Sequence, residues 1–432
     1  MKALDVRAAA AAVIGDVLGG LSLNQALPSR LEQVGERDRS LLQQLCYGTL
    51  RQGPRLQALL AQLLEKPLRD KDRDIQGLLM CGLYQLDSTR VPDHAAVDAT
   101  VGATRVLKKH WARGMTNAIL RRYLREREQM LLALDAAAAA SHPAWLHRKI
   151  IAQWPAQSAA IIEANNLQPP MTLRVNSARV TPAQYLDQLR ESGIGATAGS
   201  LSPCAVQLAR PMDVWEIPGF ATGLLSVQDE AAQMAAMLLG ASAGERVLDA
   251  CAAPGGKTCH ILELQPGLSE LVAMDIDASR LQRVTENLSR LNLNATLLAG
   301  DAAAPPAQLK NSPFDRILVD APCSASGVVR RHPDVKLLRR DSDIAQLGEL
   351  QLRILRGLWP LLKTGGTLLY ATCSIFDEEN SQVVQRFLRE QGDASLQQAD
   401  VAWGEPVASG RQLLPTADGP DGLFYALLRK VG

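Results

Sequence analysis

The chain has 432 residues, of which 47% are hydrophobic and 4% aromatic, and its formal net charge at pH 7 is +1. This length favours several domains with sizeable cores, and the chain lacks the run of about 18 apolar residues that a membrane span requires. The seven cysteines form no C-x-x-C pair, which argues against a disulfide framework and against a structural zinc site. The N-terminus lacks the apolar stretch and cleavage site of a signal peptide, so we expect a cytoplasmic protein.

Helices are predicted throughout residues 1–138. The apolar residues Leu42, Leu45, Cys46 and Leu50 recur with the spacing of one helical face. Four prolines divide the segment into lengths that suit the helices of a compact bundle. We therefore expect a helical domain at residues 1–138.

Basic residues are concentrated in two runs. The first extends from Arg105 to Arg127 and holds eight basic residues against one acidic residue, Glu126. The second extends from Arg330 to Arg340 and holds five basic residues. Such runs are typical of proteins with a polyanion partner, but a solvated helix face balanced by acids elsewhere would explain either run equally well.

Between residues 139 and 222 the sequence pattern changes from purely helical to a mixture of helix and strand. A helix is predicted from Trp145 to Trp154, and strands are predicted at Met171–Val175 and Ala205–Leu208. Between the two strands, Thr181 is a good N-cap because Pro182 follows it and a glutamine stands three residues after it. The segment 139–222 is therefore predicted to hold a linker helix and a small α+β module.

Residues 223–432 alternate between predicted strands and helices, which is the signature of a parallel sheet. The helix Ala278–Leu291 carries its apolar residues on one stripe. The segment is therefore predicted to be a single α/β domain. Its strands are predicted at Arg246–Asp249, Leu271–Asp275, Ala295–Ala299, Phe314–Val319, Gly366–Thr372 and Leu423–Leu428.

A turn of small residues connects the first of these strands to the next helix, and it contains Gly255 and Gly256. Glycine lets the backbone approach a ligand closely. A Walker phosphate loop would need glycine where Cys251 stands, and the dinucleotide pattern G-x-G-x-x-G is absent. These absences leave a ligand with an adenosine but no pyrophosphate, such as S-adenosylmethionine. Asp275, which ends the next strand, could then hold the ribose, and Asp301, after the third strand, could hold the adenine amino group.

Two cysteines each follow a buried strand of the predicted sheet. Cys323 lies in an Ala-Pro-Cys-Ser motif and Cys373 in an Ala-Thr-Cys-Ser motif, while Asp320 ends the strand before Cys323. Ligands of an open α/β sheet bind outside the carboxyl ends of its strands. A single cysteine at a strand end is most often a small buried hydrophobe, but two cysteines and an aspartate at one edge point to thiol chemistry.

With these motifs the chain resembles the RsmB (Fmu/Sun) family of bacterial 16S rRNA cytosine-C5 methyltransferases, over nearly its whole length. The resemblance implies an α/β fold: a class I Rossmann-like methyltransferase domain at 223–432, preceded by an all-α NusB-like RNA-binding bundle and the small α+β module. The segments that carry the resemblance are 37–42, 94–101, 251–257, 320–324, 327–334 and 372–374.

This resemblance implies S-adenosylmethionine as the cofactor and C5 of a cytosine in 16S rRNA, at nucleotide 967, as the methylated atom. Cytosine C5 is too weak a nucleophile to take a methyl group directly, and a thiolate that adds to C6 makes C5 reactive. By analogy with RNA methylases, Cys373 would be the nucleophile and Cys323 would assist release. DNA cytosine methylases use the Pro-Cys motif instead.

Further site residues follow from the same resemblance. Asp320 would hydrogen-bond the N3/N4 edge of the cytosine, and Lys257 would approach the base or lower the pKa of the thiol. The cofactor would contact the glycine-rich turn and three aspartates, namely Cys251, Ala252, Ala253, Pro254, Gly255, Gly256, Lys257, Asp275, Asp301 and Asp320.

The expected partner is 16S rRNA that is naked or in early small-subunit assembly, bound by a monomeric enzyme that needs no metal and no membrane. Two other functions stay open at this point. The chain could be a non-catalytic RNA-binding factor with a relic methylase domain, although its intact cysteines argue against decay. It could also be a tRNA or DNA cytosine methylase that uses the same domain.

Overall fold

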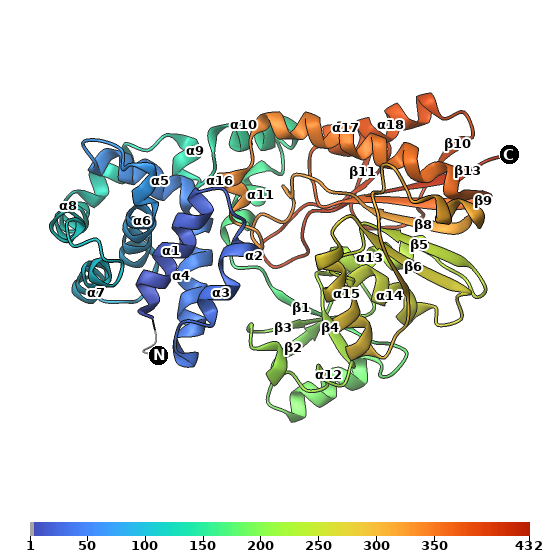
Figure 1. Ribbon diagram of the computed structural model, residues 1–432, viewed down its shortest axis with the longest axis horizontal. Helices are drawn as coiled ribbons and strands as arrows, with labels where there is room; N and C mark the ends of the chain where they lie inside the picture. The colour runs from blue at the N-terminus through green and yellow to red at the C-terminus, as the bar shows by residue number, and fades with distance from the viewer. Residues whose placement is uncertain (1–3) are drawn as a thin grey trace. The chain divides into compact units, whose positions relative to one another are not determined.

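Residues 4–432 are described by a computed structural model (Figure 1), in which they form two compact units. One unit comprises residues 4–168 together with Val329–Asp341, and the other comprises Pro169–Val328 and Ser342–Gly432. Residues 1–3, which begin the N-terminal stretch without a signal-peptide pattern, lie outside the described residues. Within residues 4–432, no helix combines the length and the apolar character needed to cross a membrane.

The helical unit is built around α6 (Arg73–Ser88), eleven of whose residues are buried. α1 (Val6–Leu18) packs so closely against it that a Cβ on Gly77 would stand 2.6 Å from the carbonyl oxygen of Ala11. The all-helical prediction for this part is confirmed. The unit's other α-helices are α2 (Leu23–Ala26), α3 (Pro28–Leu31), α4 (Arg39–Arg51), α5 (Gly53–Leu63), α7 (Asp93–Val106), α8 (Ala112–Leu132), α9 (Ala136–Ala139), α10 (Ala144–Gln153), α11 (Ser158–Asn166) and α16 (Val335–Leu338).

Residues 329–341 leave the second unit and pack into the helical unit, where they form α16. Lys336 is buried, and its Nζ donates to the carbonyl oxygen of Arg51 at 2.8 Å and to Oδ1 of Asn166 at 2.5 Å. Arg330 is also fully buried, and its carbonyl oxygen accepts from Arg51 at 3.0 Å. The second basic run is therefore not an exposed cationic patch along its whole length, because two of its five basic side chains lie in the core.

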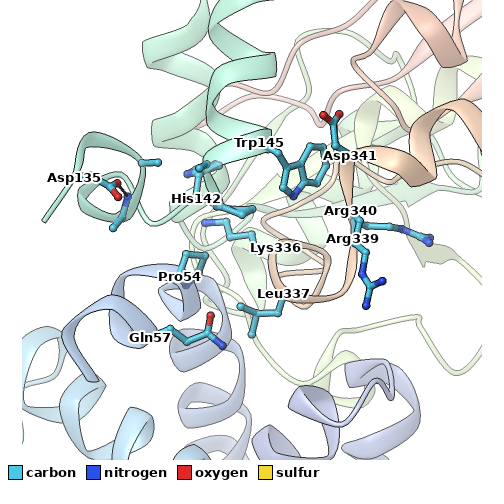
Figure 2. Close-up of a pocket in the computed structure, with 14 residues that line it drawn as sticks. Pro54, Gln57, Asp135, His142, Trp145, Lys336, Leu337, Arg339, Arg340 and Asp341 are labelled. Carbon is cyan, nitrogen blue, oxygen red and sulfur yellow. Dashed lines mark hydrogen bonds between the residues drawn. The ribbon is translucent and has the colours of Figure 1, made fainter. Parts of the chain in front are cut away.

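A pocket of about 480 Å³ opens beside this segment (Figure 2). Trp145 and Arg339 line it, as do the buried side chains of His142 and Lys336. Burial lowers the pKa of His142 to about 3, and its Nδ1 lies 2.7 Å from the carbonyl oxygen of Ala140. The imidazole is therefore neutral at physiological pH, and the positive charge in the pocket wall comes from Arg339 and Arg340, because burial lowers the pKa of Lys336 well below its usual value.

The second unit begins with a small antiparallel sheet in the strand order β2-β3-β1-β4. β1 (Met171–Val175) and β3 (Ala205–Leu208) have the predicted bounds, β2 covers Ala196–Ala198 and β4 covers Leu225–Val227. The predicted capping box is present, since Thr181 Oγ1 accepts from the backbone of Gln184 at the start of α12 (Pro182–Glu191).

The second sheet of this unit has nine strands in the order β11-β12-β13-β9-β8-β5-β6-β7, and β10 pairs with β13. β5 to β9 pair in parallel, whereas β13 runs antiparallel to β9. The predicted α/β class is thus confirmed. The strands are β5 (Arg246–Ala250), β6 (Glu270–Asp275), β7 (Thr296–Ala299), β8 (Phe314–Asp320), β9 (Leu362–Thr372), β10 (Ala394–Gln397), β11 (Glu405–Val407), β12 (Gly410–Gln412) and β13 (Phe424–Lys430).

Helices cover both faces of this sheet (Figure 1). Along β5, Val247 faces the core beneath α13 (Glu230–Leu239), α14 (Gly256–Leu264) and α15 (Ala278–Leu291). The next residue, Leu248, faces the core beneath α17 (Asp341–Leu358) and α18 (Ser381–Glu390). This alternation explains why the strands have nearly continuous apolar sequences, because parallel strands are buried on both faces.

The strand order reverses between β5 and β8, since the chain runs from β5 outward to β7 and then returns to β8 on the other side. In open α/β sheets, ligands bind at the carboxyl ends of the strands where the order reverses. The turns that follow β5, β6, β8 and β9 therefore lie at the expected position of the site.

Candidate active site

Residues 251–257 comprise the turn after β5 and the first two residues of α14, and the turn has an unusual backbone conformation. Cys251 and Gly255 have φ values of 77° and 95°, in the left-handed region that favours glycine. A Cβ on Gly255 would stand 3.0 Å from Cγ1 of Val284 in α15. The backbone N–H groups of Cys251 and Ala252 both donate to the carbonyl oxygen of Met274 at 2.8 Å. The turn is thus held against the end of β6.

Aspartates stand at or just after the ends of three strands of the parallel part of the sheet, β6, β7 and β8. Asp275 ends β6, and its Oδ2 accepts from the backbone N–H of Ala253 at 3.1 Å, which ties it to the glycine-rich turn. Asp301 follows β7 and is exposed, and its Oδ1 accepts from the backbone of Ala303 at 2.8 Å. Asp320 ends β8 and faces the same edge of the sheet. Asp301 shows no hydrogen bond that would draw it toward the cysteines.

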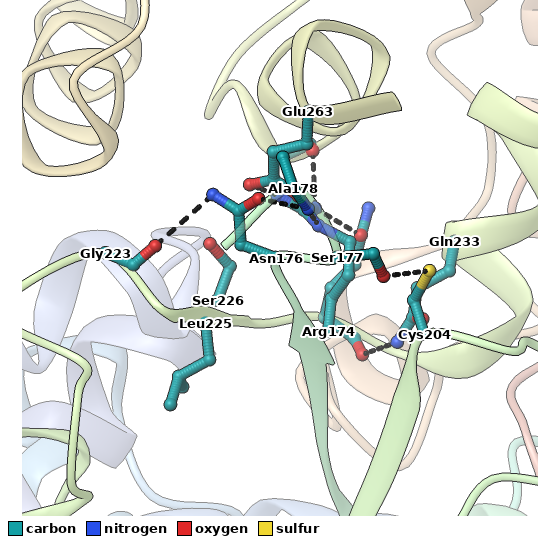
Figure 3. A network of polar contacts seen from close by, with 12 residues as sticks. Arg174, Asn176, Ser177, Ala178, Cys204, Gly223, Leu225, Ser226, Gln233 and Glu263 are labelled. Carbon is teal, nitrogen blue, oxygen red and sulfur yellow. Dashed lines mark hydrogen bonds and ion pairs between the residues drawn. The ribbon is translucent and has the colours of Figure 1, made fainter. Parts of the chain in front are cut away.

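Arg174 supports the glycine-rich turn from the small antiparallel sheet (Figure 3). It is fully buried in β1, and one guanidinium nitrogen donates to the carbonyl oxygen of Gly256 at 2.7 Å. Its other nitrogens bond both carboxylate oxygens of Glu263 in α14, each at 2.8 Å. Sequence reasoning missed this residue, although an arginine within an otherwise apolar strand was a signal for it.

The two cysteines meet at the ends of β8 and β9. Their Sγ atoms are 3.2 Å apart, because Asp320 and Ala371 are register partners at the end of the paired strands. Cys323 is 8% exposed, whereas Cys373 is half-buried. The hydrogen bond with Cys373, followed by burial, raises the pKa of Cys323 well above its usual value. Cys323 therefore keeps its proton at neutral pH, in contact with the Cys373 sulfur.

Lys257 and Asp320 form an ion pair with a distance of 2.5 Å between Nζ and Oδ2. Burial would lower the pKa of Lys257, but the Asp320 carboxylate outweighs this effect and raises it, and the Cys373 sulfur adds to the rise. The lysine is thus a buried cation that interacts electrostatically with both the aspartate and the proposed nucleophile. The structure brings Lys257, Asp320, Cys323 and Cys373 together, as the sequence predicts.

Asp249 lies near the end of β5, just before the glycine-rich turn, and the sequence identified it only as the end of a predicted strand. It is fully buried in β5, and its Oδ2 accepts from Oγ1 of Thr258 at 2.6 Å. Burial raises its pKa to about 7, although the Thr258 hydrogen bond opposes the rise. Burial also raises the pKa of Cys251, so this thiol of the glycine-rich turn is an inert packing residue at neutral pH.

Comparisons with known families assign each part of the chain. Residues 236–429 match the family described as 16S rRNA methyltransferase RsmB/F, and residues 142–215 match the ferredoxin-like domain of the RsmF/B methyltransferases. Residues 4–125 match the NusB family. The fold and the site together define a Rossmann-like methyltransferase that carries a NusB-like helical unit.

Whole-chain relatives narrow this class. A ribosomal RNA small subunit methyltransferase B from Pseudomonas syringae pv. tomato is 50% identical, covering 99% of this chain and 97% of its own length. A protein of the same name from Pseudomonas putida is 51% identical over 99% of both chains. The chain therefore belongs to the RsmB/F family of 16S rRNA methyltransferases.

Solved structures agree on the fold. The crystal structure of PH0851 aligns with a TM-score of 0.80 at 21% identity and covers 99% of both chains. A methyltransferase homologue from Pyrococcus horikoshii aligns with a TM-score of 0.59 at 29% identity, covering 70% of this chain and 97% of its own.

Methyltransferases of this family take S-adenosylmethionine as the methyl donor. The residues at this edge of the sheet fit the donor. The turn after β5 has the small residues and left-handed backbone that let a ligand approach closely, and the carboxylate of Asp275 at the end of β6 is hydrogen-bonded to that turn. Asp301, exposed beyond β7, can accept from the adenine amino group.

Proposed function

We propose that this enzyme methylates C5 of a cytosine in 16S rRNA, at nucleotide 967 by family resemblance, through a covalent bond between Cys373 and C6 of the base. The observation that carries the proposal is the pair of thiols, with Sγ atoms 3.2 Å apart, beside the Lys257–Asp320 ion pair. A methyltransferase whose substrate atom is nucleophilic enough to take the methyl group directly would have no use for two thiols at this position.

Addition of a cysteine thiolate makes C5 reactive, and its later departure restores the aromatic base. The Cys373 thiolate forms a bond to C6, and the electron pair of the C5–C6 double bond shifts onto C5, delocalised toward N3, which makes C5 nucleophilic. S-adenosylmethionine supplies an electrophilic methyl group, which C5 then takes up. Loss of the C5 proton and departure of Cys373 from C6 restore the double bond and release the product.

The protonation of the cysteine pair supports this division of roles. A nucleophilic thiol must react as the thiolate. Because Cys323 keeps its proton, it can donate to Cys373 and stabilise negative charge on the Cys373 sulfur. Cys373 is then the nucleophile, and Cys323 is next to it for the release step.

Lys257 and Asp320 stabilise the charges of the same reaction. The ammonium group of Lys257 interacts electrostatically with the Cys373 sulfur and can offset negative charge that develops there. The Asp320 side chain is 31% exposed, so a carboxylate oxygen can reach the N3/N4 edge of a cytosine at this position.

The target cytosine must leave any stacked helix before C6 can reach the thiol. In the helical unit, α8 presents the exposed Arg121 and Arg125, while Arg122 pairs with Glu126 at 2.9 Å. We infer that these arginines contact RNA phosphates, and that the substrate is naked or early-assembly 16S rRNA bound by a monomer.

Bisulfite sequencing of RNA and DNA from a deletion strain tests the proposed function. The expected result is the loss of one 5-methylcytosine from 16S rRNA, restored by the wild-type gene but not by a Cys373→Ala variant. An unchanged 16S pattern would refute the proposal. Loss of a tRNA or DNA mark instead would show another substrate, and restoration by Cys373→Ala would indicate a non-catalytic factor.

A further inference from the structure

Glu379 is a fully buried carboxylate behind the two cysteines that the proposed reaction does not use. It ends the short helix η6 (Asp377–Glu379), which follows the turn carrying Cys373. Burying a carboxylate is unfavourable unless hydrogen bonds replace its hydration. The partners of those hydrogen bonds therefore show which parts of the chain Glu379 holds in place.

The carboxylate bridges the residues that directly follow the two cysteines. Its Oε2 accepts from Oγ of Ser324 and from Oγ of Ser374, both at 2.5 Å. Its Oε1 accepts from the backbone N–H of Ser324 at 2.7 Å and from Nε2 of Gln351 at 3.4 Å. One side chain is thus bonded to the Pro-Cys-Ser turn and to the Thr-Cys-Ser turn.

A third serine strengthens the same connection. Oγ of Ser326 lies 3.1 Å from the hydroxyl oxygens of both Ser324 and Ser374, and it accepts from the backbone of Ile375 at 3.0 Å. These contacts matter because the register of β8 and β9 ends at Asp320 and Ala371, before the cysteines. Beyond that point a backbone bond, from the N–H of Gly327 to the carbonyl oxygen of Cys373 at 2.9 Å, and the side-chain hydrogen bonds of Glu379 and the three serines connect the two turns.

We propose that Glu379 is a positioning residue whose carboxylate, by bridging Ser324 and Ser374, holds Cys323 and Cys373 at their observed separation. The catalytic value of that separation rests on the proposed function, whereas the geometric claim concerns the free protein alone. A merely structural carboxylate would stabilise the fold without controlling the contact between the thiols.

Oxidation by diamide measures the contact between the thiols without RNA or S-adenosylmethionine. Diamide takes up two hydrogen atoms as the two thiols join, and peptide mass spectrometry identifies the Cys323–Cys373 disulfide. We expect Glu379→Ala to form this disulfide about tenfold more slowly than wild type, because the two turns lose the carboxylate that is bonded to both of them. Glu379→Gln retains a hydrogen-bonding amide and should recover most of the rate.

The matched control is Glu230→Ala. Glu230 is also a buried glutamate of the second unit, and it accepts from the backbone of Ser202 at 2.7 Å, away from both cysteine turns. It should leave the rate of disulfide formation at the wild-type value. If Glu230→Ala slowed the reaction as much as Glu379→Ala, general destabilisation would explain the effect and the proposal would be wrong.

Kinetics provide a second readout that a merely structural role would not move. Misplacement of reacting groups by about 1 Å can cost roughly a hundredfold in rate. We expect kcat of Glu379→Ala to fall between about tenfold and a hundredfold, while KM for RNA and the Kd for S-adenosylmethionine stay within about twofold. A wild-type kcat, or a wild-type rate of disulfide formation, would overturn the proposal.

The double variant Ser324→Ala with Ser374→Ala removes the same bridge and serves if Glu379→Ala does not fold. It should slow disulfide formation to the same degree, and adding Glu379→Gln should have little further effect, since residues of one network are not additive. A wild-type rate in the double variant would contradict the bridge. If these results hold but wild-type enzyme makes no 5-methylcytosine in 16S rRNA, the proposed function fails and the positioning role stands.

Discussion

At the scale of single residues, the buried acid Asp249 should make stability depend on pH. Burial raises the pKa of the folded carboxyl from 3.8 to about 7. Between these values the folded state binds more protons than the unfolded state, so the free energy of unfolding falls as pH rises. The stabilising contribution is complete below about pH 4 and is lost by about pH 7.

Asp249→Asn removes this titration. Compared with wild type, the variant should become more stable by roughly 2–3 kcal/mol as the pH is raised from 5 to 8, because the wild type must bury a charge over that range. Urea unfolding of both proteins at the two pH values measures the difference. A gap that does not change with pH would show that Asp249 is ionised in the folded state throughout.

Residue-level motifs were the part of the site that the sequence predicted best. Lys257, Asp320, Cys323 and Cys373 lie in short contiguous patterns, and each pattern follows an apolar strand whose end is fixed by the sheet. The supporting residues could not be predicted in this way. Glu379 belongs to no strand and to none of the predicted motifs, and its role follows from hydrogen bonds to Ser374, five residues away, and to Ser324, 55 residues away, which the sequence does not place side by side.

At the scale of elements, the contact of β1 with α14 should control the glycine-rich turn. Arg174→Met leaves Glu263 as a buried charge without its partner, which costs about 3–5 kcal/mol. It also releases the carbonyl oxygen of Gly256 from its hydrogen bond. We therefore expect lower stability and weaker binding of S-adenosylmethionine, measured by urea unfolding and by calorimetry.

The double variant Arg174→Met with Glu263→Leu separates the two effects. Removing both charges should restore much of the stability, because a well-packed apolar pair can replace a buried ion pair. The affinity for S-adenosylmethionine should stay low, since the Gly256 carbonyl is still unsupported. Full recovery of both properties would show that the turn does not need Arg174.

Element bounds were predictable where the signal was local. Strand β8 differs from its predicted bounds by one residue, and helix α15 matches its predicted bounds, because apolar periodicity and turn residues are local features. The short hairpin of β11 and β12 was not predicted. Each of its strands has three residues, too few for an alternating pattern to stand out from loop sequence.

At the scale of the whole molecule, the sequence did not reveal that residues 329–341 belong to the helical unit. The segment reads as a basic run, and its fold depends on partners such as Arg51 and Asn166, which are more than a hundred residues away. Contacts between residues so far apart in sequence produce no periodic pattern of apolar residues from which they could be predicted. It also turned Lys336 from an expected surface charge into a buried donor.

The basic face of α8 leads to a prediction for the intact enzyme. Replacing Arg121, Arg122 and Arg125 with alanine should weaken RNA binding and make the slope of log affinity against log salt shallower, by about 0.7 per lost contact with single-stranded RNA. The turnover at saturating RNA should be nearly unchanged. Filter binding at several salt concentrations measures the slope, and Arg190→Ala, an exposed arginine of the second unit, is the control.

Unchanged affinity and salt slope in the triple variant would show that α8 presents only a solvated face. Of the three arginines, Arg122 should contribute least to the salt slope, because its charge is already paired with Glu126 and a paired charge releases fewer counterions than an unpaired one. The helical unit would then need a different role from RNA binding.

The division of labour between the two cysteines is the central claim, and a denaturing gel of enzyme incubated with S-adenosylmethionine and 16S rRNA tests it most directly. Cys323→Ala should methylate but fail to release, giving a shifted, RNase-sensitive band in which Cys373 is bonded to RNA. Cys373→Ala should give neither the band nor methylation, while its affinity for S-adenosylmethionine stays nearly intact. A band from Cys373→Ala and none from Cys323→Ala would contradict the account and make Cys323 the nucleophile.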